Sequence, residues 1–172
     1  MNAEEKITKA KECLDIVAKQ EDELQFPYFG YNEAYALGET VIKIAHDRNL
    51  SIACEIVING FMVFRAARPG TGLGNEKWMR NKRNTMMSCG HSSLYFTYSL
   101  AARGRTRDEG LMPASDYAIC GGGFPIFVKN TGIIGYVCVS GLQHEEDHRV
   151  IMQAMNHILG AEAPETPFES GF

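Results

Sequence analysis

The chain has 172 residues, of which 45% are hydrophobic and 22% are charged. These values are typical of one folded domain with a buried core, and they exclude a disordered chain. The formal net charge of −4 argues against a general nucleic-acid binder, because such proteins usually carry a basic surplus. No apolar run approaches the roughly 20 residues that a membrane-spanning helix requires, so we expect no membrane partner.

The cysteines form no CxxC pair and are odd in number, at Cys13, Cys54, Cys89, Cys120 and Cys138. This scattered spacing favours reduced thiols over a disulfide framework or a zinc ribbon, and reduced thiols are typical of the cytosol. The N-terminal residues, MNAEEKITKAKECLD, lack the apolar segment of a secretory signal. We therefore expect a cytoplasmic protein.

The first part of the chain predicts two helices separated by an aromatic connector. Apolar residues recur loosely through residues 2–24, which is the pattern of a surface helix. A proline and a glycine within residues 26–30 interrupt it. A second helix is expected to begin at Asn32, a good N-cap residue, and to end near residue 47. His46 lies in its last turn, where we expect a structural role.

Two antiparallel hairpins are predicted next. Residues 51–58 and 61–67 are rich in apolar residues and surround an Asn-Gly dipeptide, which suits the positive φ angles of a type I′ turn. Residues 124–128 and 133–140 form the second pair, preceded by a run of three glycines that allows a bend. Residues 116–119 are expected to enter a short strand.

Three further helices are predicted, over residues 76–88, 92–102 and 144–159. Gly90 marks the joint between the first two. The charged residues 104–113 should form an exposed loop, and residues 161–172 a mobile tail after a single domain at residues 1–160. The fold class is therefore α+β.

The glycine-rich segment 69–74 does not satisfy a nucleotide-binding fingerprint. Asn75 stands where a dinucleotide motif needs a glycine, and the preceding hairpin is antiparallel rather than a parallel βαβ unit. A P-loop would also need a Gly-Lys-Ser/Thr sequence. We therefore favour a flexible crossover.

A cluster of cations surrounds the only tryptophan. In a helix, Lys77, Arg80 and Arg83 would lie about one turn apart and form a cationic face beside Trp78. Arginine forks suit carboxylates and phosphates, which indicates an anionic ligand. The alternative is a solvated face or a rim of salt bridges between subunits.

His91 follows a glycine and precedes two hydroxyl residues, Ser92 and Ser93. A neutral imidazole at this position could contact a ligand or its metal, and helix-start amides would add to an anion site. The alternative is a capping histidine bonded to the backbone. A hydrolase that uses His91 and Ser92 is a weaker hypothesis, because no base and orienting group can be recognised from the sequence.

Residues 144–148 read HEEDH and satisfy the HExxH pattern of zinc proteases. The motif lies at a helix start, however, and only His157 and a few acids follow as third ligands. We therefore favour an acidic helix entry and expect no metal site.

The chain resembles the GlcG/HbpS-like (haem-degrading domain) family, and within it a largely uncharacterised subgroup. The resembling segments are residues 36–72, WMRNKRNTMMSCGHSSLYF (78–96) and GGGFPIFVKNTGIIGYVCVSGLQHEEDH (121–148), with the helix that follows. His144 departs from the subgroup pattern. The positions that match it are the candidate ligand-binding residues, namely Trp78, Arg80, Lys82, Arg83, His91, Ser92, Ser93, Asp147 and His148.

The resemblance implies a profilin-like fold, with a five-stranded antiparallel sheet flanked by helices, assembled into homo-oligomers. It also implies haem as a cofactor in some members, with His91 as the best-placed candidate here. Our first hypothesis is a cytosolic protein that binds a small anionic ligand, such as haem through its propionates. The alternative is an oligomeric scaffold without catalysis, in which the cations pair with a neighbouring subunit. A non-enzymatic role is favoured.

Overall fold

Ten elements follow one another in this computed structural model, which describes residues 2–105 and 112–167. They are α1 (Ala3–Glu23), β1 (Gln25–Phe26), α2 (Tyr31–Asp47), β2 (Ala53–Ile58), β3 (Phe61–Ala67), α3 (Leu73–Cys89), α4 (Ser93–Ala101), β4 (Gly123–Val128), β5 (Gly132–Ser140) and α5 (His144–Leu159). The α+β class, the five strands and the flanking helices agree with the expectation.

The strands form one mixed sheet in the order β1-β4-β5-β2-β3. The predicted hairpins β2–β3 and β4–β5 are confirmed, and β2 and β5 join them in an antiparallel pair. The expectation of a purely antiparallel sheet is wrong, because β1 pairs parallel with β4. β1 has two residues, and so short a strand leaves no alternating pattern that a sequence could reveal.

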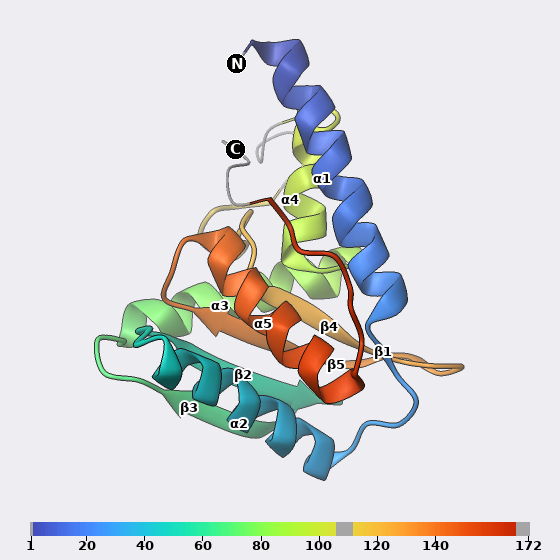
Figure 1. The fold of residues 1–172 in the computed structure, drawn as a ribbon. Coiled ribbons are helices and arrows are strands. Elements are labelled where there is room, and N and C mark those ends of the chain that lie inside the picture. The colour runs from blue at the N-terminus through green and yellow to red at the C-terminus, as the bar shows by residue number, and fades with distance from the viewer. Residues whose placement is uncertain (1, 106–111, 168–172) are drawn as a thin grey trace.

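Helices cover both faces of the sheet (Figure 1). α2 and α5 lie side by side on one face, and their apolar residues form the main core with the strands. On the other face, Met79 and Met86 of α3 pack against Tyr136 and Cys138 of β5. β2 is consequently buried along its whole length.

α1 runs along α4 beside the sheet (Figure 1). Cys13 and Val17 of α1 pack against Leu94 and Tyr98 of α4. Gln20 falls on the same stripe of α1, at a spacing that continues the apolar one, and is fully buried. α1 is therefore more than the surface helix that its loose pattern predicts, because it carries polar groups into the interior.

Two helices begin earlier than expected, and side chains of the first turn explain both shifts. Gly30, rather than Asn32, is the N-cap of α2, and its N–H donates to the Glu33 carboxylate over 2.8 Å. α3 begins about one turn earlier than predicted, since the Asn75 side-chain oxygen accepts from the Gly72 N–H over 2.9 Å. Each bond satisfies a backbone donor ahead of the helix.

Residues 116–119 are wrongly predicted as a strand. They form a turn and loop held against α3, where the Ala118 N–H donates to the Thr85 hydroxyl over 3.2 Å. Side chains of α3 therefore take the hydrogen bonds that a strand would need from a neighbouring strand. Of the expected loop at 104–113, residues 106–111 lie outside the described residues.

The C-terminal segment is described as far as residue 167. Ala163 is 5% exposed, and the carbonyl oxygen of Pro164 accepts a hydrogen bond from Gln20 Nε2 at 2.6 Å. This part of the expected tail thus packs on α1, while residues 168–172 lie outside the described residues. The division into a domain at 1–160 and a mobile tail remains a prediction. Among the helices described, none is long and apolar enough to cross a membrane.

Candidate functional site

The cations of α3 have different surroundings. Lys82 is 2% exposed and points into the interior, whereas Arg80 is exposed and donates to the Ser115 carbonyl oxygen over 3.4 Å. Arg83 is half-buried and interacts with Tyr136 of β5. Helical spacing predicts a cationic face of Lys77, Arg80 and Arg83. Of these, Arg80 contacts a loop carbonyl and Arg83 contacts a phenol, so the two do not present one cationic surface. Lys82, which lies outside that predicted face, contacts an acid.

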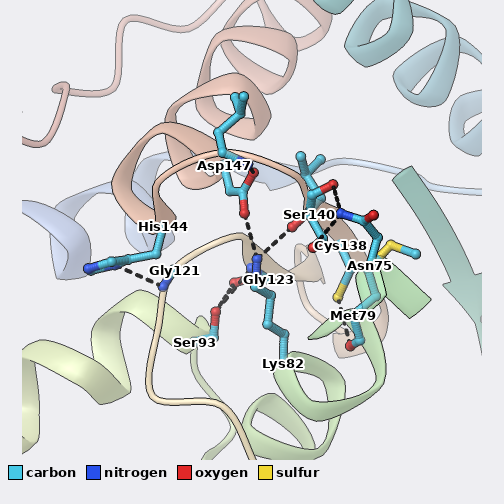
Figure 2. A network of polar contacts seen from close by, with 12 residues as sticks. Asn75, Met79, Lys82, Ser93, Gly121, Gly123, Cys138, Ser140, His144 and Asp147 are labelled. Carbon is cyan, nitrogen blue, oxygen red and sulfur yellow. Dashed lines mark hydrogen bonds and ion pairs between the residues drawn. The ribbon is translucent and has the colours of Figure 1, made fainter. Parts of the chain in front are cut away.

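A buried ion pair joins α3 to α5 (Figure 2). Lys82 Nζ lies 2.8 Å from Asp147 Oδ2, and it donates a second hydrogen bond to the Val139 carbonyl oxygen at 2.8 Å. The other oxygen of Asp147 accepts from the Leu142 N–H over 3.0 Å. Burial raises the pKa of Asp147 above its ordinary value, although Lys82 acts against this. The two charges neutralise each other and both groups have further hydrogen-bond partners, which favours a structural role for the pair.

A pocket of about 370 Å³ opens beside this ion pair, between the starts of α3 and α5. We call it the α3–α5 pocket, and it is lined by Asn75, Trp78, Lys82, Cys120, Ser140, Gly141, Leu142, His144 and Asp147. Trp78 is 51% exposed at this pocket, and three of the predicted ligand-binding residues therefore meet there. The Asn75 side-chain amide donates a hydrogen bond to the Ser140 carbonyl oxygen over 3.1 Å.

The two histidines of the HExxH pattern have separate hydrogen-bond partners. His144 Nδ1 accepts from the Gly121 N–H over 3.2 Å, so the proton is on Nε2, which faces Glu145 Oε1 at 3.1 Å. His148 is fully buried and its Nε2 lies 2.9 Å from Gln20 Oε1. No group of three potential metal ligands occurs within the described residues.

Ser92 and Ser93 are fully buried and bound to the backbone. The Ser92 hydroxyl caps α4 by accepting from the Tyr95 N–H over 3.1 Å. The Ser93 hydroxyl accepts from the Gly123 N–H over 3.0 Å and so ties α4 to β4. Both hydroxyls are buried and bonded to backbone N–H groups, and this geometry does not support the hydrolase hypothesis.

His91 is bound to a carboxylate rather than to the backbone. Its Nδ1 lies 2.6 Å from Glu21 Oε2, while Glu21 Oε1 accepts from the Ser92 N–H over 2.7 Å. The imidazole also stacks on Tyr95, with ring centroids 4.0 Å apart and planes 11° apart. Glu21 is 6% exposed, whereas the His91 side chain is 43% exposed. The ring is thus held firmly on one edge and open on the other.

His91 lines a pocket of about 520 Å³ between α1 and α4. This α1–α4 pocket is lined by Lys11, Leu14, Cys89, His91, Tyr95, Phe96, Ser99, Ala102 and Arg103. Its walls are largely apolar and aromatic, and its rim carries two cations. Burial raises the pKa of the Cys89 thiol above its ordinary value.

Sequence reasoning missed Glu21 and Gln20, the partners of His91 and His148. Gln20 stands three residues after Val17 and seven after Cys13, which places it on the buried stripe of α1. A polar residue at a core position signals a buried hydrogen bond. The sequence held this signal, but only the structure shows which partner it meets.

The protein is a small α+β domain with one mixed sheet and helices on both faces. It has one pocket where α1 meets α4 and another where α3 meets α5. The family model described as "Haem degrading protein HbpS-like" matches residues 29–156, so the chain belongs to this family, as predicted. A UPF0303 protein of Rhizobium rhizogenes is 40% identical over 149 residues, which cover 87% of this chain and 92% of that protein.

Solved structures support the fold. The Ybr137w protein superimposes with a TM-score of 0.78 at 25% identity, covering 86% of this chain and 87% of that chain. A structure described as the PduOC:Heme complex superimposes with a TM-score of 0.61 at 14% identity, covering 78% of this chain and 97% of that chain. At 14% identity the likeness concerns the fold alone.

Proposed function

We propose that this protein is a cytosolic haem-binding protein that holds haem in the α1–α4 pocket, with Nε2 of His91 as the iron ligand. The His91–Glu21 pair is the observation that carries the proposal. A metal-binding histidine usually donates its second N–H to a carboxylate or carbonyl, which fixes the tautomer and makes the ligating nitrogen more basic. Glu21 does this at Nδ1 and leaves the Nε2 lone pair for the metal.

The rest of the pocket fits the same group. About 520 Å³ lies within the usual range for cofactor sites, and the aromatic side chains of Tyr95 and Phe96 suit a flat macrocycle. Lys11 and Arg103 at the rim suit two carboxylates such as the propionates. Bound haem would supply a redox-active iron, whereas the chain orients His91 and excludes water from one side. The family and the haem complex of a structural neighbour also support the proposal.

Hemin titration of the purified chain tests this assignment. We expect wild-type protein to shift and sharpen the Soret band with a saturable, one-site curve, and His91→Ala to lose this spectrum. His46→Ala is the matched control, because His46 is exposed at the end of α2 and should leave the titration unchanged. No spectral change with wild type, or the same spectrum with His91→Ala, would contradict the proposal.

Glu21→Gln probes the carboxylate behind the ligand. Because the second partner orients the imidazole and raises its basicity, we expect haem affinity to fall by roughly 10–100-fold while one-site binding persists. The reduction potential of the bound iron should also move, which a merely structural effect on α4 would not produce. Equal affinity and potential in both proteins would show that Glu21 does not act through His91.

A second candidate function is self-association, which the exposed edge strand β3 favours. β3 ends the sheet and leaves one row of backbone groups unpaired, as in strands that add to another chain. Phe61 and Met62 of β3 are 62% and 41% exposed. On α2, Tyr31 lies beside Phe61 and is 59% exposed, and Tyr35 lies beside Phe64 of β3 and is 56% exposed. Such an apolar patch on an open edge suits a second copy of the same strand.

Light scattering after gel filtration tests this candidate. Phe61→Lys should lower the assembly mass to that of the monomer, because a charge on the edge opposes strand pairing. Leu73→Lys is the control, since Leu73 is equally apolar and 89% exposed but starts α3 away from this edge. A monomeric wild type, or an unchanged mass for Phe61→Lys, would exclude this interface.

A further inference from the structure

A third pocket lies on the α3 face of the sheet, where the two hairpins extend past the end of the helix. It has a volume of about 450 Å³ and is lined by Val57, Asn59, Gly60, Arg83, Met87, Ile133, Ile134, Gly135 and Tyr136. We call it the α3–hairpin pocket. Its walls are mostly aliphatic, and Met87 and Ile133 are 73% and 46% exposed at its mouth. It shares no residue with the α1–α4 pocket.

Arg83 is the one charged side chain that lines this pocket, and the described residues supply no ion-pair partner for it. Two acids, Glu55 and Glu76, lie on the same side of the sheet, but both form ion pairs with Arg65. It lies 3.7 Å from Glu55 and forms a closer ion pair with Glu76. Glu55 forms no ion pair with Arg83 and acts on it only through a longer-range electrostatic interaction. A guanidinium without a carboxylate is therefore left at an apolar cavity.

Tyr136 completes the polar end of the pocket. It is 5% exposed, and its hydroxyl interacts with the Arg83 guanidinium, which keeps the pKa of Arg83 raised. Burial raises the pKa of Tyr136 to about 12, so the hydroxyl keeps its proton at neutral pH. Because Arg83 donates to the phenol oxygen, the phenol O–H remains a donor for a further acceptor.

We propose that the α3–hairpin pocket binds a small monocarboxylate with an apolar chain or ring, whose carboxylate pairs with Arg83. The guanidinium and the Tyr136 hydroxyl both donate, and a carboxylate only accepts, so the polar ends match. The aliphatic walls formed by Val57, Ile133 and Ile134 take the apolar body. The pocket volume lies within the range for small-molecule sites. A neutral apolar molecule matches only the walls, and a purely polar anion matches only Arg83 and Tyr136.

Calorimetric titration with octanoate and its neutral analogue octanamide tests the proposal on the full chain. We expect wild type to bind octanoate at least about tenfold more tightly than octanamide, since a charged hydrogen bond contributes most of the difference. Arg83→Met keeps the length and apolar stem of the side chain and should weaken octanoate binding by roughly 10–100-fold. It should leave octanamide binding unchanged. Tyr136→Phe should weaken octanoate binding to a smaller extent.

Arg80→Met is the matched control, because Arg80 lies one turn earlier in α3 and is exposed outside the pocket. It should bind octanoate like wild type. In wild type, octanoate should also shift the amide NMR signals of Gly60 and Gly135, which requires no substitution. Equal binding of acid and amide, unchanged binding by Arg83→Met, shifts confined to other residues, or no binding at millimolar octanoate would each overturn the proposal. His91→Ala should retain octanoate binding, which separates this site from the haem site.

Discussion

Replacing Asp147 with alanine is expected to lower the free energy of unfolding by about 3–5 kcal/mol. The substitution leaves the ammonium of Lys82 buried at 3% side-chain exposure, and among the described residues it then keeps only the Val139 carbonyl oxygen as a hydrogen-bond partner. It also removes the acceptor for the Leu142 N–H at the entry to α5. A buried charge without its counter-charge is costly because the low-polarity interior cannot replace the lost water.

Urea unfolding followed by circular dichroism measures this effect. Asp47→Ala is the matched control, since Asp47 pairs with Lys43 on the surface of α2 and its loss should change stability little. The double variant Lys82→Met/Asp147→Leu should recover most of the loss, because an apolar pair of similar volume needs no desolvation of charges. A loss below about 1 kcal/mol for Asp147→Ala would show that Lys82 finds water or another partner.

Acidification is expected to unfold the protein partly through His148. Burial lowers the pKa of His148 to about 3, with the nearby charges of His144, Lys82 and Arg149 acting in the same direction. Its Nε2 is bound to Gln20, its ring packs on Phe124, and its Nδ1 has no hydrogen-bond partner in the described part of the chain. A proton on Nδ1 would therefore introduce a buried, unpaired donor and a positive charge.

The sign of the pH effect follows from this depressed pKa. The unfolded chain binds a proton at His148 near pH 6.5 and the folded chain does so only near 3, so the contribution is present above 6.5 and is lost as the pH falls. Between pH 6.5 and pH 4 the loss is about 3 kcal/mol. Stability curves of wild type and His148→Gln should diverge by this amount, because glutamine can still bind Gln20 but cannot be protonated. Parallel curves would contradict the assignment.

Local chemistry explains why much of the fold could be predicted. Asn59 and Gly60 have φ angles of 48° and 83°, as a type I′ turn requires, and the turn sets the pairing of β2 with β3. Ser92 is the N-cap of α4, at the position where hydroxyls and a preceding glycine indicate a helix start. These features depend on neighbouring residues, and a sequence contains that information directly.

The candidate site was less accessible from the sequence. Helical spacing correctly places the cations on α3, but it cannot tell that Lys82 faces an acid whereas Arg83 faces a phenol. The choice of His91 as a ligand-binding residue stays a prediction, and its partner Glu21 comes from a helix that the loose apolar pattern assigned to the surface. β1 escaped notice for a related reason, because its two residues join the sheet only through a distant strand.

The sequence by itself therefore determined the hairpins, most of the helices and membership of the HbpS-like family, since turn residues, apolar periodicity and family motifs are local or linear signals. Only the tertiary structure decided which polar groups meet. Lys82 and Asp147 are 65 residues apart and His91 and Glu21 are 70 apart. Such pairs form where packed helices and strands bring them together, and the free energy of that packing comes from the whole core rather than from either residue.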